Sequence, residues 1–200
     1  MSKIVAGLSF LVLCMAAASP AVAGGIDNKN NFSAEWVRTL NRNAAIDSAD
    51  TVVYNPAGTT LMDEGFYLNL SGQYAIKDYT NAIGGRAYDS DTPDFVPALF
   101  ALYRKDDWGL FGAFTIPVGG GKVEYKNGSA TTVRLARRLG AAGGGTATKQ
   151  YMEGESYYYG FTFGGSYALN DVVSFSAAAR YLDANIERNG HVFFTGGILG

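Results

Sequence analysis

Three arginines in a long polar segment are the first residues whose types and spacing could do binding chemistry. Residues 131–140 are predicted to form a helix that Thr131 or Thr132 caps and that Gly140 ends. Guanidinium groups bind phosphates and carboxylates, so an arginine face of this helix is a candidate contact for an anionic ligand or surface. A simple solvated face is the alternative. Spacings of three and four residues put three arginines on one face of this helix, namely Arg134, Arg137 and Arg138.

Side chains that could carry catalysis or hold a metal are few. His191 is the only histidine, and the only cysteine, Cys14, lies near the start of the chain. Metal sites and nucleophile–base pairs need such residues in sets, so we predict no metal, no cofactor and no enzymatic activity. Residues 119–122 place glycines before a lysine, but Val123 stands where a phosphate loop needs Ser or Thr.

The first 23 residues have the anatomy of a secretory signal peptide. Lys3 is followed by an apolar stretch from Ile4 to Ala18 and then by small residues at 21–23, a typical cleavage pattern. An N-terminal membrane anchor is the alternative, although the apolar run is short for a spanning helix. We therefore expect export and removal of residues 1–23, which leaves a chain without cysteine.

The composition of the chain indicates an all-β protein. The formal net charge is −2 and charged residues are 17%, so we expect no basic surface for nucleic acid. Aromatic residues are 14%, which excludes a disordered chain. Beyond residue 23, no apolar run of the sequence approaches the roughly 20 residues of a membrane-spanning helix.

Five stretches alternate larger apolar with smaller or polar residues, as β-strands do. The clearest has Tyr157, Tyr159 and Phe161 on one face and small residues on the other. In water the aromatic side would face a core, whereas in an outer-membrane barrel it faces lipid and the small polar side faces the lumen. The predicted strands cover residues 66–76, 95–104, 108–117, 157–168 and 173–182.

The lengths of the strands and of their connectors favour the barrel. Runs of about 10 residues match a tilted strand that crosses a bilayer. Transmembrane barrels join such strands by long outer loops and short periplasmic turns. We therefore predict a transmembrane antiparallel β-barrel with Lys77 and Arg180 on its lumen face, and a soluble sandwich is the alternative. Long and short connectors alternate at residues 77–94, 105–107, 118–156 and 169–171.

Five strands are too few to close a barrel. Residues 183–200 are predicted to form another loop, and single-chain bacterial barrels have at least eight strands. An open sheet edge in lipid leaves backbone groups unpaired. We therefore expect residues 64–200 to be the N-terminal part of a larger barrel, and assembly of the barrel from several chains is the alternative.

The segment before the first strand resembles a known family. Residues 47–58, DSADTVVYNPAG, resemble the hatch motif of the FadL-type outer-membrane transporters of long-chain fatty acids and other hydrophobic compounds. Residues 169–175 and 184–188 are similar to the family's fourth turn-and-strand region. The resemblance implies a fourteen-stranded barrel that is plugged by an N-terminal hatch, here residues 24–63.

The resemblance also implies a function in the bacterial outer membrane. Extracellular loops would catch a hydrophobic substrate, which would enter the barrel and leave sideways at a kinked third strand, here residues 108–117, without energy input. Asn55, Pro56 and Ala57 would form a gating element. The expected partners are a fatty acid or other hydrophobic ligand, outer-membrane lipid and lipopolysaccharide. Candidate contacts for the ligand or the lipopolysaccharide are Arg134, Arg137, Arg138 and Arg180.

Two other functions stay open from the sequence. A porin-like general diffusion channel would have the same kind of barrel with an open lumen. An outer-membrane lipid-modifying enzyme would need a set of Ser, His and acid that includes His191.

Overall fold

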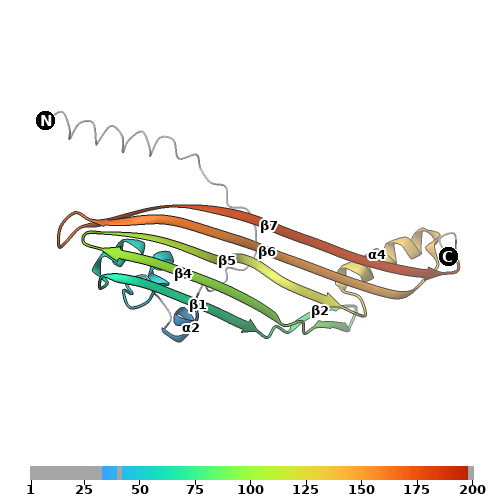
Figure 1. Ribbon diagram of the computed structural model, residues 1–200. Helices are drawn as coiled ribbons and strands as arrows, with labels where there is room; N and C mark the ends of the chain where they lie inside the picture. The colour runs from blue at the N-terminus through green and yellow to red at the C-terminus, as the bar shows by residue number, and fades with distance from the viewer. Residues whose placement is uncertain (1–32, 40–41, 198–200) are drawn as a thin grey trace, which may run out of the picture.

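The computed structural model describes residues 33–39 and 42–197, and these residues form an antiparallel β-sheet protein. The main sheet has five strands in the order β1-β4-β5-β6-β7, and a separate hairpin pairs β2 with β3. Figure 1 shows a long, curved sheet with α4 near one end and the short N-terminal helices toward the other. The predicted all-β class is confirmed, whereas the predicted signal peptide, residues 1–23, lies outside the described residues.

All five predicted alternating stretches are strands of the main sheet. Two residues, Asp106 and Asp107, join the second predicted strand to the third, and Asp106 has the left-handed φ of 49° that Asp tolerates. Residues 169–173 join the fourth predicted strand to the fifth, so both predicted short turns are confirmed. The strands are β1 (Gly65–Ala75), β4 (Asp94–Lys105), β5 (Trp108–Tyr125), β6 (Thr146–Ala168) and β7 (Ser174–Thr195).

The last three strands are longer than the sequence pattern predicted. They contain 18, 23 and 22 residues. The predicted loop over residues 118–156 is therefore wrong at both of its ends, and the predicted loop after residue 182 is wrong, since β7 continues to Thr195. Clean alternation is lost there because charged residues and glycines interrupt it. Backbone pairing does not depend on that pattern, and the β6–β7 ladder continues to the pair of Thr146 with Thr195.

The two long connections contain regular structure of their own. Helix α4 (Ala130–Leu139), followed by the short η2 (Gly140–Gly144), lies between β5 and β6, where the sequence predicted a helix. Its cap is Ser129 rather than the predicted Thr131 or Thr132, because the Ser129 and Thr132 hydroxyls each accept the other residue's backbone N–H in a capping box. The connection between β1 and β4 holds the hairpin of β2 (Tyr79–Ile83) and β3 (Arg86–Ser90).

An N-terminal segment, residues 33–39 and 42–64, covers one face of the sheet, which we call the inner face. It contains α2 (Ala34–Thr39), α3 (Thr51–Tyr54) and the 3-10 helix η1 (Pro56–Leu61). The hydrophobic core lies between this segment and the sheet. It consists of Ala49, Val52, Met62, Ala98, Phe100, Leu102, Phe111 and Ala113.

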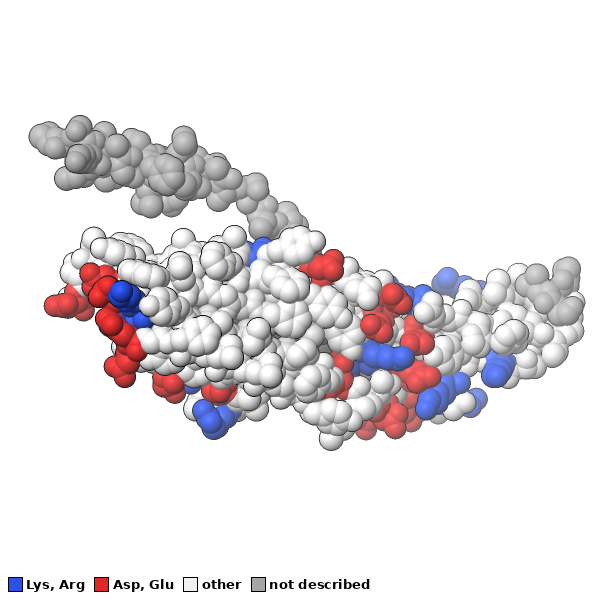
Figure 2. Space-filling view, in the orientation of Figure 1, with Lys and Arg blue, Asp and Glu red and all other residues white. Residues whose placement is uncertain are grey.

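The opposite, outer face of the sheet is apolar and exposed. Leu70 is 80% exposed and Phe163 is 68% exposed, whereas Phe100 on the inner face is fully buried. Figure 2 shows few charged side chains over the middle of the sheet in view and more toward its two ends. Within the described part of the chain, no helix has both the length and the apolar character needed to cross a membrane. The large exposed residues of the outer face include Phe66, Leu68, Leu70, Tyr74, Phe161, Phe163, Tyr167, Phe175 and Tyr181.

Candidate functional site

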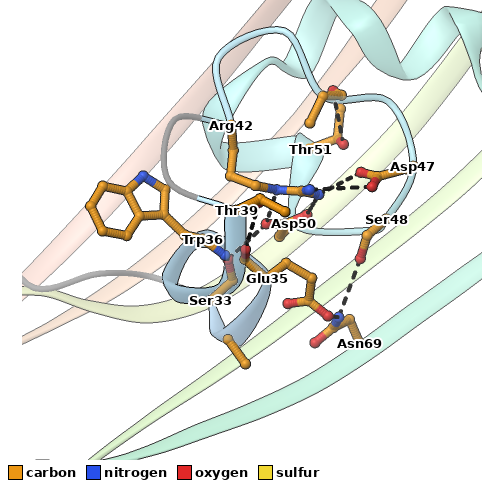
Figure 3. Close-up of polar contacts among 12 residues, drawn as sticks. Ser33, Glu35, Trp36, Thr39, Arg42, Asp47, Ser48, Asp50, Thr51 and Asn69 are labelled. Atoms are coloured by element: carbon orange, nitrogen blue, oxygen red, sulfur yellow. Dashed lines mark hydrogen bonds and ion pairs between the residues drawn. The ribbon is translucent and has the colours of Figure 1, made fainter.

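A buried ion cluster holds the N-terminal segment together (Figure 3). The Arg42 guanidinium binds the Asp50 carboxylate twice, from Nε to Oδ2 at 2.9 Å and from Nη2 to Oδ1 at 2.6 Å. The Ser33 hydroxyl donates a further bond to Asp50 Oδ2 at 2.7 Å. All three residues are buried. Bidentate pairing of this kind fixes the orientation of both side chains as well as their distance.

Asp47 forms the exposed side of the same cluster. Its Oδ1 lies 2.6 Å from Nη2 of Arg42, and its side chain is 63% exposed. The guanidinium lowers the pKa of Asp47, mainly through this hydrogen bond. The hydrogen bond to Asp50, and to a smaller extent the one to Asp47, raises the pKa of Arg42. The pairing therefore keeps Arg42 and Asp47 charged and ties the loop before α3 to a single arginine.

Polar contacts connect this segment to β1. The Asn69 side-chain amide on β1 donates to Glu35 of α2 at 2.7 Å and to the Ser48 hydroxyl at 3.3 Å (Figure 3). The Ser71 hydroxyl donates to Asn69 Oδ1 at 2.9 Å. Ser48 belongs to the segment that carries the family resemblance, so that segment contacts the first strand directly.

The predicted gating residues form the junction between two short helices. Asn55 ends α3, and its backbone N–H donates to the Thr51 carbonyl at 2.8 Å. Pro56 occupies the first position of η1, where its missing N–H costs no helical hydrogen bond. Ala57 follows within η1, and its carbonyl accepts from the Thr60 hydroxyl at 2.9 Å. The three residues thus set the turn that directs η1 toward the sheet.

Two hydroxyl bridges join η1 to the last two strands. Thr59 Oγ1 lies 2.6 Å from Oγ of Ser166 on β6. Thr60 Oγ1 lies 2.8 Å from Oγ of Ser174 on β7. These bonds come directly after the Asn55–Ala57 turn, so the turn positions the two hydroxyls that join the N-terminal segment to the sheet.

Strand β5 leaves β4 partway along its length. The two strands pair from Lys105 with Trp108 as far as Leu99 with Phe114, and the described residues contain no pair beyond that point. Pro97 on β4 and Pro117 on β5 lie just beyond the last of these pairs, and neither has a backbone N–H to donate. We call the interval between residues 94–98 of β4 and 115–121 of β5 the β4–β5 split.

The split also disturbs the other side of β5. Its pairing with β6 shifts register between Thr115 and Val118 and again between Val118 and Gly121. The Thr115 and Ser156 hydroxyls lie buried in this region without a hydrogen-bond partner among the described residues. The resemblance implied a kink within residues 108–117. The irregularity begins only at Thr115, and the stretch before it pairs regularly.

Two adjoining hollows lie over the far parts of the sheet, one between α4, β6 and β7 and the other along β5, β6 and β7. Each has a volume of about 330 Å³. The one against α4 is lined largely by apolar side chains, among them Leu135, Leu139 and Phe194. The other reaches the β5 irregularity at Gly120 and Gly121. Met152 and Arg188 line both hollows, so the two adjoin, and we call the pair the depression between α4 and the split.

The predicted basic residues lie in two separate places. The α4 arginines are exposed, and none of them forms a hydrogen bond or ion pair with the described residues. Arg180 is not with them, because its Nε donates to the Thr162 hydroxyl on β6 at 2.8 Å. Lys77 forms an ion pair with Asp94. The α4 arginines are Arg134, Arg137 and Arg138.

His191 lies in an aromatic stack rather than beside a nucleophile. Its ring stacks on Tyr151 at 5.2 Å between centroids and meets Phe193 edge-on at 5.0 Å. Among the described residues, no group of three or more His, Cys, Asp or Glu could hold a metal ion.

Sequence reasoning missed two parts of this site. It placed Asp47 and Asp50 in the hatch-like segment without a role of their own and left Arg42 unassigned, although one arginine within eight residues of both acids is a signal for a local ion cluster. It gave Arg188 no role of its own, because the strand that brings this residue to the hollows was predicted to end earlier.

No protein-family model matches the sequence, and neither a curated protein nor a solved structure matches it.

Proposed function

We propose that the protein carries long-chain fatty acids or other hydrophobic small molecules passively across the bacterial outer membrane. In this proposal the five strands belong to a larger, plugged β-barrel of the FadL type, and residues 24–63 form the plug. The observation that carries the proposal is the contrast between the two faces of the sheet. The outer face exposes large apolar side chains. The inner face is covered by the N-terminal segment, which polar side-chain contacts hold to the strands.

The contrast supports a position in the membrane, because large apolar side chains in water-soluble proteins are usually buried. A contiguous apolar surface of this kind on a soluble monomer is rare. In an outer-membrane barrel the same surface contacts acyl chains. The short turns at one end and the long, structured connections at the other also match the asymmetry of such barrels.

Unpaired sheet edges support the larger barrel. The outer edges of β1 and β7 have no strand beside them in the main sheet of the described residues. Backbone groups without partners cost several kcal/mol each in hydrocarbon. Further strands that pair with both edges would close the sheet around the N-terminal segment.

The depression between α4 and the split supports an amphipathic substrate. Leu135, Leu139 and Phe194 offer an apolar surface to a hydrocarbon tail. Arg188 borders both hollows and offers a guanidinium to a carboxylate. The β4–β5 split, at the end of this depression, is the proposed sideways exit toward the membrane.

Uptake by intact cells tests the proposal. The complete protein is expressed in a host that lacks its own fatty-acid transporter, and entry of a radiolabelled long-chain fatty acid is measured. We expect uptake well above that of the empty host, and a lower rate for Arg188→Met than for the control Arg38→Met, which removes an exposed arginine far from the hollows. No uptake of any apolar substrate would contradict the proposal. Large ion conductance by the purified protein in planar bilayers would favour a porin-like channel instead.

A further inference from the structure

We propose that Lys77, Asp94 and Tyr157 form a latch that holds the β4–β5 split closed, with Lys77 as its positioning residue. The inference rests on the proposed function only in taking the split as the exit for substrate. The latch itself is argued from contacts that replace the backbone ladder where β5 leaves β4.

Lys77, just after β1, reaches across β4 to the irregular part of β5. Its Nζ donates to the Gly120 carbonyl at 3.1 Å and to the Lys122 carbonyl at 3.0 Å. It also lies 3.3 Å from Oδ2 of Asp94, the first residue of β4. An ammonium has three N–H donors, and these three acceptors use all of them. Lys77 therefore binds β4 and β5 at the level where they do not pair.

Asp94 extends the connection to β6. The Tyr157 hydroxyl donates to Asp94 Oδ1 while Lys77 holds Oδ2. The side chains of Lys77 and Asp94 are only 13% and 10% exposed. A buried ion pair contributes little to stability over an apolar pair of the same volume, so its value here lies in fixing one arrangement of the strands.

Gly121 makes room for the ion pair. Its φ is +66°, a conformation that side chains other than glycine rarely adopt. A Cβ at this position would collide with the Asp94 carboxylate and the Lys77 ammonium. The backbone of β5 can thus approach the latch closely only because residue 121 has no side chain.

Side-chain bonds suit an exit that must open and close again. When a backbone ladder opens, its strands can pair again in a shifted register. The Lys77 ammonium can release the Gly120 and Lys122 carbonyls and bind them again while the β4–β5 pairs from Lys105–Trp108 to Leu99–Phe114 stay in place. The unpartnered hydroxyls of Thr115 and Ser156 lie in the same region, so this part of the wall already lacks full hydrogen bonding.

Amide hydrogen exchange of the complete protein in lipid nanodiscs tests the latch without any transport. In Lys77→Met we expect exchange over residues 118–125 to be faster by about tenfold, with residues 108–114 unchanged. Lys77→Arg should stay close to wild type, and Lys126→Met, which removes an exposed lysine, should have no effect. If Lys77→Met fails to fold, Tyr157→Phe, which keeps the ion pair, should give a smaller acceleration in the same residues. Unchanged exchange in the folded variants would overturn the latch.

Transport kinetics then separate a latch from a binding residue. Opening the exit should raise the maximal uptake rate of Lys77→Met by about threefold and leave the half-saturating concentration unchanged. A loss of fatty-acid uptake with no change for a neutral alkane would instead make Lys77 a carboxylate-binding residue and overturn the latch. Faster exchange in a protein that transports nothing, wild type included, would refute the proposed function but not the latch.

Discussion

Arg42 is the side chain on which the N-terminal segment depends most. It satisfies Asp50 with two hydrogen bonds in a site from which water is excluded. Among the described side chains, Arg42→Met would leave buried Asp50 with only the Ser33 hydroxyl, and breaking a buried pair in this way costs about 3–5 kcal/mol. We expect that loss in the free energy of unfolding of the N-terminal segment, followed by Trp36 fluorescence in a Trp108→Phe background. Arg38→Met removes an exposed arginine and should cost far less; equal losses would contradict the role given to Arg42.

Asp47 gives the same cluster a pH dependence. Arg42 lowers the pKa of Asp47, so the native state binds this proton less readily than the unfolded state does. Its contribution to stability is present above its ordinary pKa of about 4 and is lost as the pH falls through the lower native pKa. We expect the Trp36 signal to hold steady from neutral pH down to about 5 and to change below about 4. Asp47→Asn should make the change in the Trp36 signal below about pH 4 smaller. A variant whose signal follows the same pH dependence as wild type would show that Asp47 does not contribute.

At the scale of the strand, Phe163 tests which face meets hydrocarbon. Phe163→Arg places a charge on the exposed apolar side of β6 and should cost about 2–4 kcal/mol near the middle of a bilayer. Phe193→Arg changes another exposed aromatic residue, near the far end of β7, and should cost about 1 kcal/mol or less. The measurement is reversible folding into lipid vesicles in urea. Equal costs at the two positions would mean that Phe163 does not face lipid.

The strands could be predicted from the sequence because apolar and polar residues alternate along a strand whose two faces have different surroundings. Phe66, Leu68 and Leu70 lie on the exposed face where period two placed them. Alternation fails on β4 and β5, since Phe100 and Phe111 are apolar on the inner face as well. They pack beneath the N-terminal segment, and nothing within a strand's own pattern indicates what a distant segment will cover.

The candidate site was less predictable because its contacts join residues far apart in the chain. Ser166 has the small polar character of a lumen residue, but its bond to Thr59 crosses 107 positions. Asp94 and Tyr157, 63 positions apart, meet only because β5 leaves β4. The Asn55–Ala57 turn, by contrast, follows from local chemistry, because Pro56 sets the start of the helix that it begins.

In the molecule as a whole, three features lie along one curved sheet. The N-terminal segment fills the inner face near the short turns, α4 and its hollows lie at the other end, and the β4–β5 split lies between them (Figure 1). A substrate that entered beside α4 would meet the split before it reached the tethered N-terminal segment. This order depends on the outer face being in contact with lipid, since a sideways exit needs a membrane beside it.

Quenching by brominated lipid measures that contact directly. Single tryptophans are introduced by Phe163→Trp or Phe193→Trp in a background where Trp36 and Trp108 are phenylalanine, and the protein is folded into vesicles whose acyl chains carry bromine near the bilayer centre. If the outer face contacts lipid, we expect strong quenching at residue 163 and weak quenching at residue 193. Fluorescence at residue 163 that bromine leaves unchanged would contradict that contact.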